Sequence, residues 1–253
     1  MYIDKETQAS LHYLKEVVQH LDDPICLLGG WAVYYLVNDK YNEAQGSNYL
    51  GSRDVDLGFN NIKSMNKAIF KLEKMGFERL SFRMFKELHT ETMKELTKEE
   101  SKTTPTHYIF PMYVDLIIAK SDKTTRSNLG FAPIDEPLLK HIFEGHNQKD
   151  IKLFSTKVIL PSSALLLNMK LNSIKDRDKE HKRLKDLCDI VTLCLYSGID
   201  LDILIEKLDK LILVKERKKS LNVINEEDIK RVSQSIKVSE ENINALLKKL
   251  TYM

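Results

Sequence analysis

Three aspartates stand at positions where apolar strands are expected. Asp54 and Asp56 are separated by one apolar residue, and Asp115 lies inside the apolar run 113–118. A carboxylate in a buried strand costs free energy unless a cation compensates its lost hydration. Residues i and i+2 of a strand point to the same face, about 6.6 Å apart at Cα, so Asp54 and Asp56 project together. The pattern predicts a metal-dependent enzyme that acts on a nucleoside triphosphate.

A glycine pair upstream of these acids fits the same chemistry. Gly29 and Gly30 end an apolar run and precede a helix-like segment, so backbone N–H groups can approach phosphates at a helix N-terminus. Ser52 and Arg53, directly before the paired acids, add a hydroxyl and a cation to this predicted pocket. Two Mg²⁺ ions about 3.5–4 Å apart stabilise the attacking and leaving oxygens of an in-line phosphoryl displacement.

The hydrophobic pattern places these residues on strands and turns. We expect strands at 25–28, 53–59 and 112–119, and a last strand at 152–160. A helix follows the glycine pair, and residues 38–52 are expected to form a loop. The segment 86–104 is dense in Lys, Glu and Thr, and it is either a lid or a solvated loop. His residues show no metal-ligand spacing, and Trp31 is expected to anchor the core.

The chain changes character at Pro161. Everything that follows has helical periodicity, which predicts an α/β (α+β) protein with an α/β domain at 1–160 and a helical domain at 161–253. The 39 basic and 37 acidic residues nearly balance, so net charge does not indicate nucleic-acid binding. Three cysteines without a paired spacing and the absence of an apolar signal or membrane-length segment predict a cytoplasmic protein that does not interact with membranes.

These residues resemble a known superfamily. The segments Leu28-Gly29-Gly30-Trp31-Ala32, Ser52-Arg53-Asp54-Val55-Asp56-Leu57 and Val114-Asp115-Leu116 resemble the DNA polymerase β-type nucleotidyltransferases. The resemblance implies that residues 1–160 form a nucleotidyltransferase-type catalytic domain, with a mixed sheet flanked by helices. It also implies that Asp54, Asp56 and Asp115 are catalytic and bind Mg²⁺ at a two-metal site, while Gly29, Gly30, Ser52 and Arg53 bind the nucleoside triphosphate. The Gly-Gly-Trp-Ala and Asp-Val-Asp-Leu segments are similar to small-molecule (aminoglycoside- and lincosamide-type) adenylyltransferases, which use ATP.

The second half of the chain resembles a different branch. The segments 158–162, 166–170 and 185–190, together with Arg177, are similar to AbiEii-type, minimal nucleotidyltransferases, which include toxins of toxin–antitoxin systems. This resemblance implies that Lys170 and Asp186 bind the nucleotide, with Asp189 as the second acid of the downstream pair, and it leaves open whether an antitoxin partner exists. Two departures from the pattern are a long gap between Gly30 and Asp54 and the position of Arg53 directly beside Asp54.

Several alternatives remain open on the sequence. If the chain is an enzyme, the acceptor of the nucleotidyl group is an RNA or tRNA end, a protein, or a small molecule. The alternative to an enzyme is a non-catalytic nucleotide-binding module. Lys170 either meets phosphate or extends from an apolar helix face to solvent. The basic run 175–185 is the candidate surface for RNA, although such runs are more often solvated. The run 215–219 lacks the interleaved aromatic residues of a single-strand binding surface.

Overall fold

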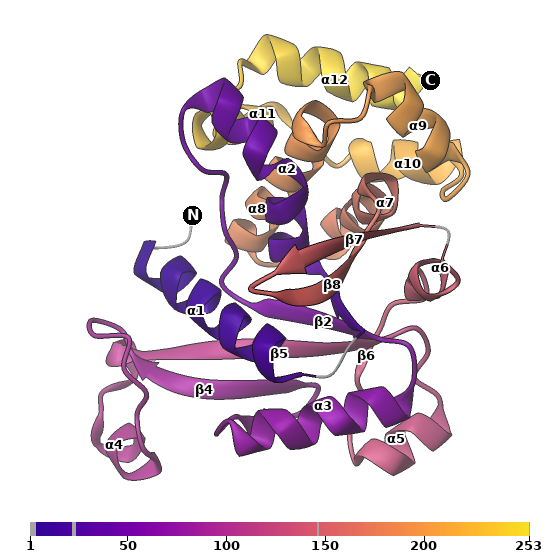
Figure 1. Ribbon diagram of the computed structural model, residues 1–253. Helices are drawn as coiled ribbons and strands as arrows, with labels where there is room; N and C mark the ends of the chain where they lie inside the picture. The colour runs from indigo at the N-terminus through magenta and orange to yellow at the C-terminus, as the bar shows by residue number, and fades with distance from the viewer. Residues whose placement is uncertain (1–3, 22–23, 146, 253) are drawn as a thin grey trace. The chain divides into compact units, whose positions relative to one another are not determined.

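A computed structural model describes residues 4–21, 24–145 and 147–252 (Figure 1). The chain divides into two compact units. One unit, the sheet unit, contains the described residues up to Trp31 together with Gly51–Leu160. The other, the helical unit, contains Ala32–Leu50 and the described chain from Pro161 onward.

A mixed eight-stranded sheet organises the sheet unit. Its order is β3-β4-β5-β2-β1-β8-β7, and β6 pairs with β5. The pairs β2–β5, β1–β8 and β5–β6 are parallel, whereas β1–β2, β3–β4 and β4–β5 are antiparallel. The strands are β1 (Ile25–Leu27), β2 (Val55–Phe59), β3 (Glu78–Leu80), β4 (Arg83–His89), β5 (Ile109–Ile118), β6 (Ile134–Asp135), β7 (Gln148–Leu153) and β8 (Thr156–Pro161).

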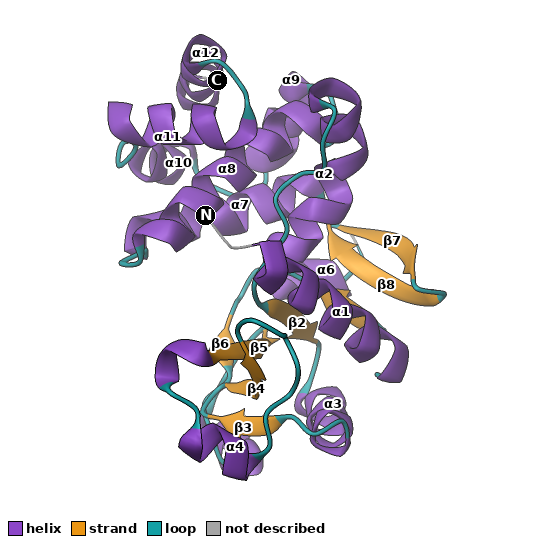
Figure 2. Ribbon diagram, turned by 90° about the vertical axis from the view of Figure 1, so that its left-hand side faces the viewer, coloured by secondary structure: helices purple, strands orange, loops and turns teal. Residues whose placement is uncertain are grey.

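Two amphipathic helices, α1 (Asp4–His20) and α3 (Ile62–Lys74), cover one face of the sheet, as Figures 1 and 2 show from two sides. The side chain of Asn61 caps α3 by accepting a hydrogen bond from the Ser64 N–H. Apolar residues at helical spacing fix which face of α3 is buried: Met65, Ala68, Ile69 and Leu72. The unit also contains α4 (Lys98–Thr103), η1 (Thr106–Tyr108), α5 (Lys123–Leu129) and α6 (Leu139–Phe143).

The helical unit is a bundle built mainly from the second half of the chain. The apolar helix α7 (Ser163–Ser173) packs against α8 (Glu180–Tyr196), α9 (Leu201–Asp209) and α10 (Val214–Leu221). Helix α11 (Glu226–Ile236) packs against α8 and α12 (Glu240–Tyr252). Ser162 caps α7, and Asn225 forms a capping box at the start of α11.

The prediction of a mixed sheet with flanking helices and a helical C-terminal region is confirmed. Three local predictions differ from the structure. The segment 86–104, expected to be a lid or a solvated loop, contains residues 86–89 of β4 and the helix α4. Helix α2 (Gly29–Gln45) continues through most of the segment expected to be a loop. The strand expected at 152–160 is a hairpin, because Phe154 and Ser155 both adopt positive φ angles between β7 and β8.

The core of each unit consists mainly of aliphatic side chains. In the sheet unit Trp31 is 1 % exposed and its indole N–H donates to Ser10 Oγ at 2.9 Å, so its predicted role as a core anchor is confirmed. No helix among the described residues is both long and apolar enough to cross a membrane.

Candidate functional site

The register of β2 and β5 brings two of the three predicted acids together. These strands pair in parallel, and Asp56 is aligned with Asp115. Because aligned residues of neighbouring strands point to the same face of a sheet, the two carboxylates share a face. Asp54 lies one residue before β2, two positions from Asp56. Both Asp54 and Asp56 act electrostatically on Asp115, so the structure brings the three acids into one neighbourhood.

The glycine pair lies directly beside this neighbourhood. Gly29 begins α2 with a φ of +60°, and a Cβ atom there would lie 1.8 Å from Asp56 Oδ2. The preceding residue, Leu28, donates its N–H to the Asp56 carbonyl oxygen at 2.9 Å. Only glycine fits this close approach and this φ angle without displacing the carboxylate. The N-terminus of α2, with Gly30 buried behind it, therefore lies against Asp56.

Asp115 is a buried acid whose ionisation is strongly perturbed. Its side chain is only 8 % exposed. Burial, with Asp56 and then Asp54 as neighbouring negative charges, raises the Asp115 pKa to about 7, although the Arg83 guanidinium opposes the shift. The buried Oδ1 atom of Asp115 has no hydrogen-bond partner. A carboxylate with an unsatisfied buried oxygen among other carboxylates is a site that a cation would stabilise.

Arg83 is a site residue that the sequence did not indicate. Strand β4 pairs antiparallel with β5 and places Arg83 opposite Asp115. The Arg83 Nη2 atom donates to Asp115 Oδ2 at 2.8 Å, and its guanidinium lies 4.2 Å from the centre of the Tyr113 ring. Arg83 thus holds one oxygen of Asp115 and leaves the other without a partner. The signal that could have found it is a lone arginine in an alternating strand, but the β4–β5 register cannot be read from sequence.

Ser52 and Arg53 lie in the segment that leads into Asp54. Ser52 is buried, at 7 % exposed. The Arg53 guanidinium forms an ion pair with Glu6 at 3.4 Å and lies 4.8 Å from the centre of the Phe110 ring. These contacts orient Arg53 within the sheet unit. Their roles toward a nucleotide stay predictions.

Lys170 and Asp186 belong to a buried ion-pair cluster of the helical unit. The Lys170 ammonium lies 2.5 Å from Asp186 Oδ1 and 2.7 Å from Asp189 Oδ2. Burial by itself raises the Asp186 pKa, but Lys170 and Arg177 more than offset this and lower it to about 2. Lys185, Ser173 and Tyr49 complete the cluster through further hydrogen bonds to the two carboxylates. The sequence resemblance singled out Lys170 and Asp186 as nucleotide-binding residues, but it did not indicate that they bind one another.

The acids suit Mg²⁺ by their chemistry. Carboxylate oxygens are the hard ligands that this ion prefers, and the Oδ1 atom of Asp115, which has no hydrogen-bond partner, is available as a metal ligand. In the described part of the chain, however, no three or more Asp, Glu, His or Cys side chains are already placed to hold a metal ion. The contact between Arg83 and Asp115 accounts for part of this, since it directs one carboxylate oxygen to a guanidinium. A fully formed metal site requires these side chains to rearrange.

Comparisons with known proteins give little further identification. No family model matches the chain, and no curated protein is similar to it in sequence. Among solved structures, the chain is similar to an antigenic nucleotidyltransferase-like protein from Paracoccidioides brasiliensis, with 15 % identity over 92 % of each chain and a TM-score of 0.43.

Proposed function

We propose that the chain is a nucleotidyltransferase, which moves a nucleoside monophosphate group from a nucleoside triphosphate to an acceptor. The observation that carries this proposal is the alignment of Asp56 with Asp115 on parallel strands, beside a helix start where only glycine fits. A structural ion pair explains Arg83 with Asp115, but it does not explain why two further carboxylates adjoin a buried one. Three acids in one neighbourhood beside a helix N-terminus are what nucleotidyl transfer needs.

Each acid has a proposed role in this reaction. Asp54, Asp56 and Asp115 would hold Mg²⁺, which when bound stabilises negative charge on the reacting phosphate oxygens. The Asp115 carboxylate orients the acceptor hydroxyl and takes its proton as the oxygen attacks the α-phosphorus. The bond to pyrophosphate breaks, and pyrophosphate leaves.

The N-terminus of α2 supports the triphosphate in this proposal. The N–H groups at Gly29 and Gly30 have no partners within the helix, and they favour anions. Ser52 and Arg53 add a hydroxyl and a cation. Direct contact of Lys170 and Asp186 with the nucleotide requires the Lys170 ammonium to exchange one of its carboxylate partners for a phosphate oxygen.

The acceptor is the open part of the proposal. We retain an RNA or tRNA end or a protein as the leading acceptor, as in a toxin–antitoxin system with a neutralising partner, and a small molecule as the alternative. ATP is the nucleotide to test first. The rival to catalysis is a module that binds nucleotide without turnover.

Transfer assays with radiolabelled nucleotides separate these possibilities. The full chain is incubated with Mg²⁺ and each α-labelled nucleoside triphosphate, with and without total tRNA, and label is followed in RNA, protein and small molecules. Asp115→Asn is expected to abolish transfer, and Asp150→Asn is the matched control because Asp150 pairs with Lys157 on the β7–β8 hairpin. Nucleotide binding without transfer to any acceptor would support the inert module. Full activity of Asp115→Asn would overturn the catalytic assignment.

A further inference from the structure

A lysine stripe with an aromatic residue inside it runs along α3. Lys63, Lys67, Lys71 and Lys74 are spaced by four, four and three residues, which places them on one side of the helix. Phe70 lies within this stripe and is 57 % exposed. The Lys74 ammonium is 4.3 Å from the centre of the Phe70 ring. An exposed phenylalanine among lysines is not needed for packing, because the apolar face of α3 is already buried on the other side.

Two pockets follow the same helix. A pocket of about 310 Å³ is lined by Leu21, which follows α1, by residues of β1 and β2, and by Lys63 and Lys67. A second pocket of about 480 Å³ lies further along, where His12, His20 and Glu16 of α1 face Lys71 and Lys74. Both pockets are lined by α3 and by α1 or the residue that follows it, and we name the two pockets together the α1–α3 groove.

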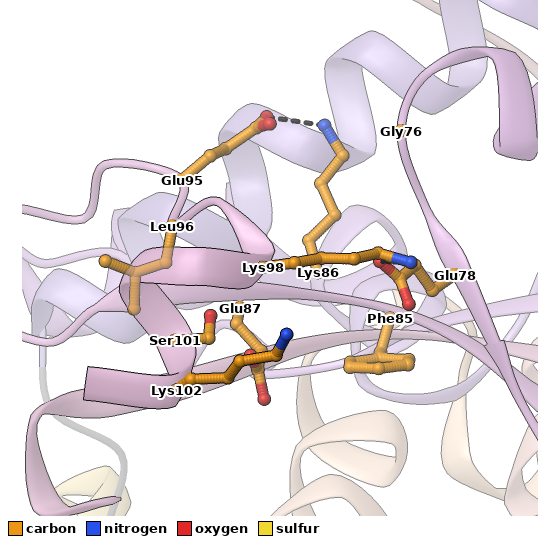
Figure 3. A pocket seen from close by; sticks show the side chains of 10 residues that line it. All are labelled: Gly76, Glu78, Phe85, Lys86, Glu87, Glu95, Leu96, Lys98, Ser101 and Lys102. Carbon is orange, nitrogen blue, oxygen red and sulfur yellow. Dashed lines mark hydrogen bonds and ion pairs between the residues drawn. The ribbon is translucent and has the colours of Figure 1, made fainter. Parts of the chain in front are cut away.

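The groove has a local excess of positive charge. The charged side chains that line it, histidines aside, are five lysines and two glutamates, whereas the whole chain has 39 basic and 37 acidic residues. The fifth lysine, Lys86, is 9 % exposed at its side chain and forms an ion pair with Glu95 at 2.5 Å. Figure 3 shows Lys86 extending from β4 toward Glu95, where the pair also borders a neighbouring pocket. Because Lys86 neutralises Glu95, the other charged residues that line the groove, histidines aside, are four lysines and one glutamate, Glu16.

We propose that the α1–α3 groove binds a single-stranded nucleic acid. The stripe from Lys63 to Lys74 spans about 16 Å at 1.5 Å per residue, the length of a segment of a few nucleotides. Lysines along it neutralise consecutive phosphates, and the open face of Phe70 stacks on a base. Phe70 lies in the lysine stripe beside the two pockets, and base stacking on an aromatic residue along a basic groove is the usual means of binding single strands without sequence preference.

This site is separate from the candidate active site. The side chains of Met84, Lys86 and Leu88 alternate with Arg83 along β4, so Lys86 points to the opposite face of the sheet from Arg83 and Asp115. The helices α1 and α3 cover one face of the sheet (Figure 1), and Lys86 points to that face because it lines a pocket together with residues of both helices. Binding in the groove is therefore measured without any catalytic turnover, and its failure leaves the nucleotidyltransferase proposal untouched.

Fluorescence anisotropy with a 5′-labelled 12-nucleotide single strand tests the proposal, with RNA and DNA of the same sequence as separate probes. The full chain is expected to bind one or both at low salt, and a matched duplex at least 10-fold more weakly. With four phosphate contacts, the plot of log K against log salt has a slope of about −3. Phe70→Ala is expected to weaken binding on the order of 10-fold, since it removes one stacked base.

Charge-reversal variants separate the groove from general electrostatics. The combined substitution Lys63→Glu, Lys67→Glu and Lys74→Glu changes only exposed side chains, and it is expected to weaken binding at least about 10-fold and to reduce the salt slope by about 2. The matched control reverses the same number of exposed lysines elsewhere in the sheet unit, at Lys140, Lys149 and Lys152. Circular dichroism confirms that each variant is folded. Three results would each overturn the proposal: no binding of either strand, equal loss in the control, or unchanged affinity in Phe70→Ala.

Discussion

Replacing Asp115 by Asn removes one negative charge from a crowded site and keeps the shape of the side chain. In the native protein the Asp115 pKa is raised from 3.8 to about 7, chiefly by burial and then by Asp56. The folded state therefore holds a proton that the unfolded chain releases at lower pH. Stability from this group is complete below about pH 4, and it is lost as pH rises to about 7.

The size of the effect follows from the shift. About three pKa units at 1.36 kcal/mol each give a ceiling of about 4 kcal/mol, of which about 3 kcal/mol is lost between pH 5 and pH 8. Asparagine behaves as the protonated acid at every pH, and its carbonyl oxygen can still accept the Arg83 hydrogen bond. At pH 5 the free energy of unfolding of the variant is therefore expected to be closer to that of the wild type. At pH 8 it is expected to exceed the wild-type value by roughly 1–3 kcal/mol. This is less than the ceiling of about 4 kcal/mol, because relaxation of the site reduces the cost of the charged carboxylate.

Urea unfolding in EDTA at pH 5 and pH 8 measures this difference. Repeating the pH 8 series with Mg²⁺ is expected to stabilise the wild type and to leave Asp115→Asn unchanged, because the ion removes the same repulsion that the substitution removes. The matched control, Asp150→Asn, lies outside the site and is expected to show the same pH dependence as the wild type. If the free-energy gap between Asp115→Asn and wild type is equal at the two pH values, the three carboxylates are not crowded and the argument fails.

Three further substitutions test other parts of the structure. Gly29→Ala is expected to lower the free energy of unfolding by roughly 1–3 kcal/mol and to abolish transfer, because the residue has φ +60° and no space for a Cβ atom; a thermal melt equal to that of the wild type would contradict this. Lys170→Met leaves two buried carboxylates without their shared ammonium and is expected to cost about 3–5 kcal/mol, measured by urea unfolding, while a loss under 1 kcal/mol would show that the cluster is weakly coupled. Arg83→Met removes the guanidinium that opposes the upward pKa shift of Asp115. The carboxyl ¹³C resonance of Asp115 is therefore expected to titrate at a higher pH than in the wild type, and a lower midpoint would exclude the ion pair.

The positions of the acids in the fold could be predicted because strand periodicity and charge act locally. An aspartate in an apolar run, such as Asp115, is costly enough to require a partner, and its place on a strand was correctly read. The change to helical structure at Pro161 was also visible, since the period of the apolar residues changes there. Both inferences depend only on residues close in sequence.

Features that depend on pairing between distant segments could not be predicted. Arg83 becomes a site residue only through the β4–β5 register, which no local signal specifies. The hairpin between β7 and β8 turns at Phe154 and Ser155, and neither is the Gly or Asn that usually occupies a position with a positive φ angle. The sequence also could not show that Lys170 is held by two carboxylates, because helix packing brings α7 and α8 together.

The parallel pairing of β1 with β8 has a consequence for synthesis of the protein. Ile25 and Cys26 pair with Val158 and Ile159, so one side of this apolar strand has no neighbour until about 130 later residues have been translated. At roughly 5–20 residues per second the delay is on the order of ten seconds. During that interval a nascent chain exposes a hydrophobic strand edge, which favours association with other chains. Chaperone demand and yield on expression should therefore depend on how quickly the ribosome reaches β8.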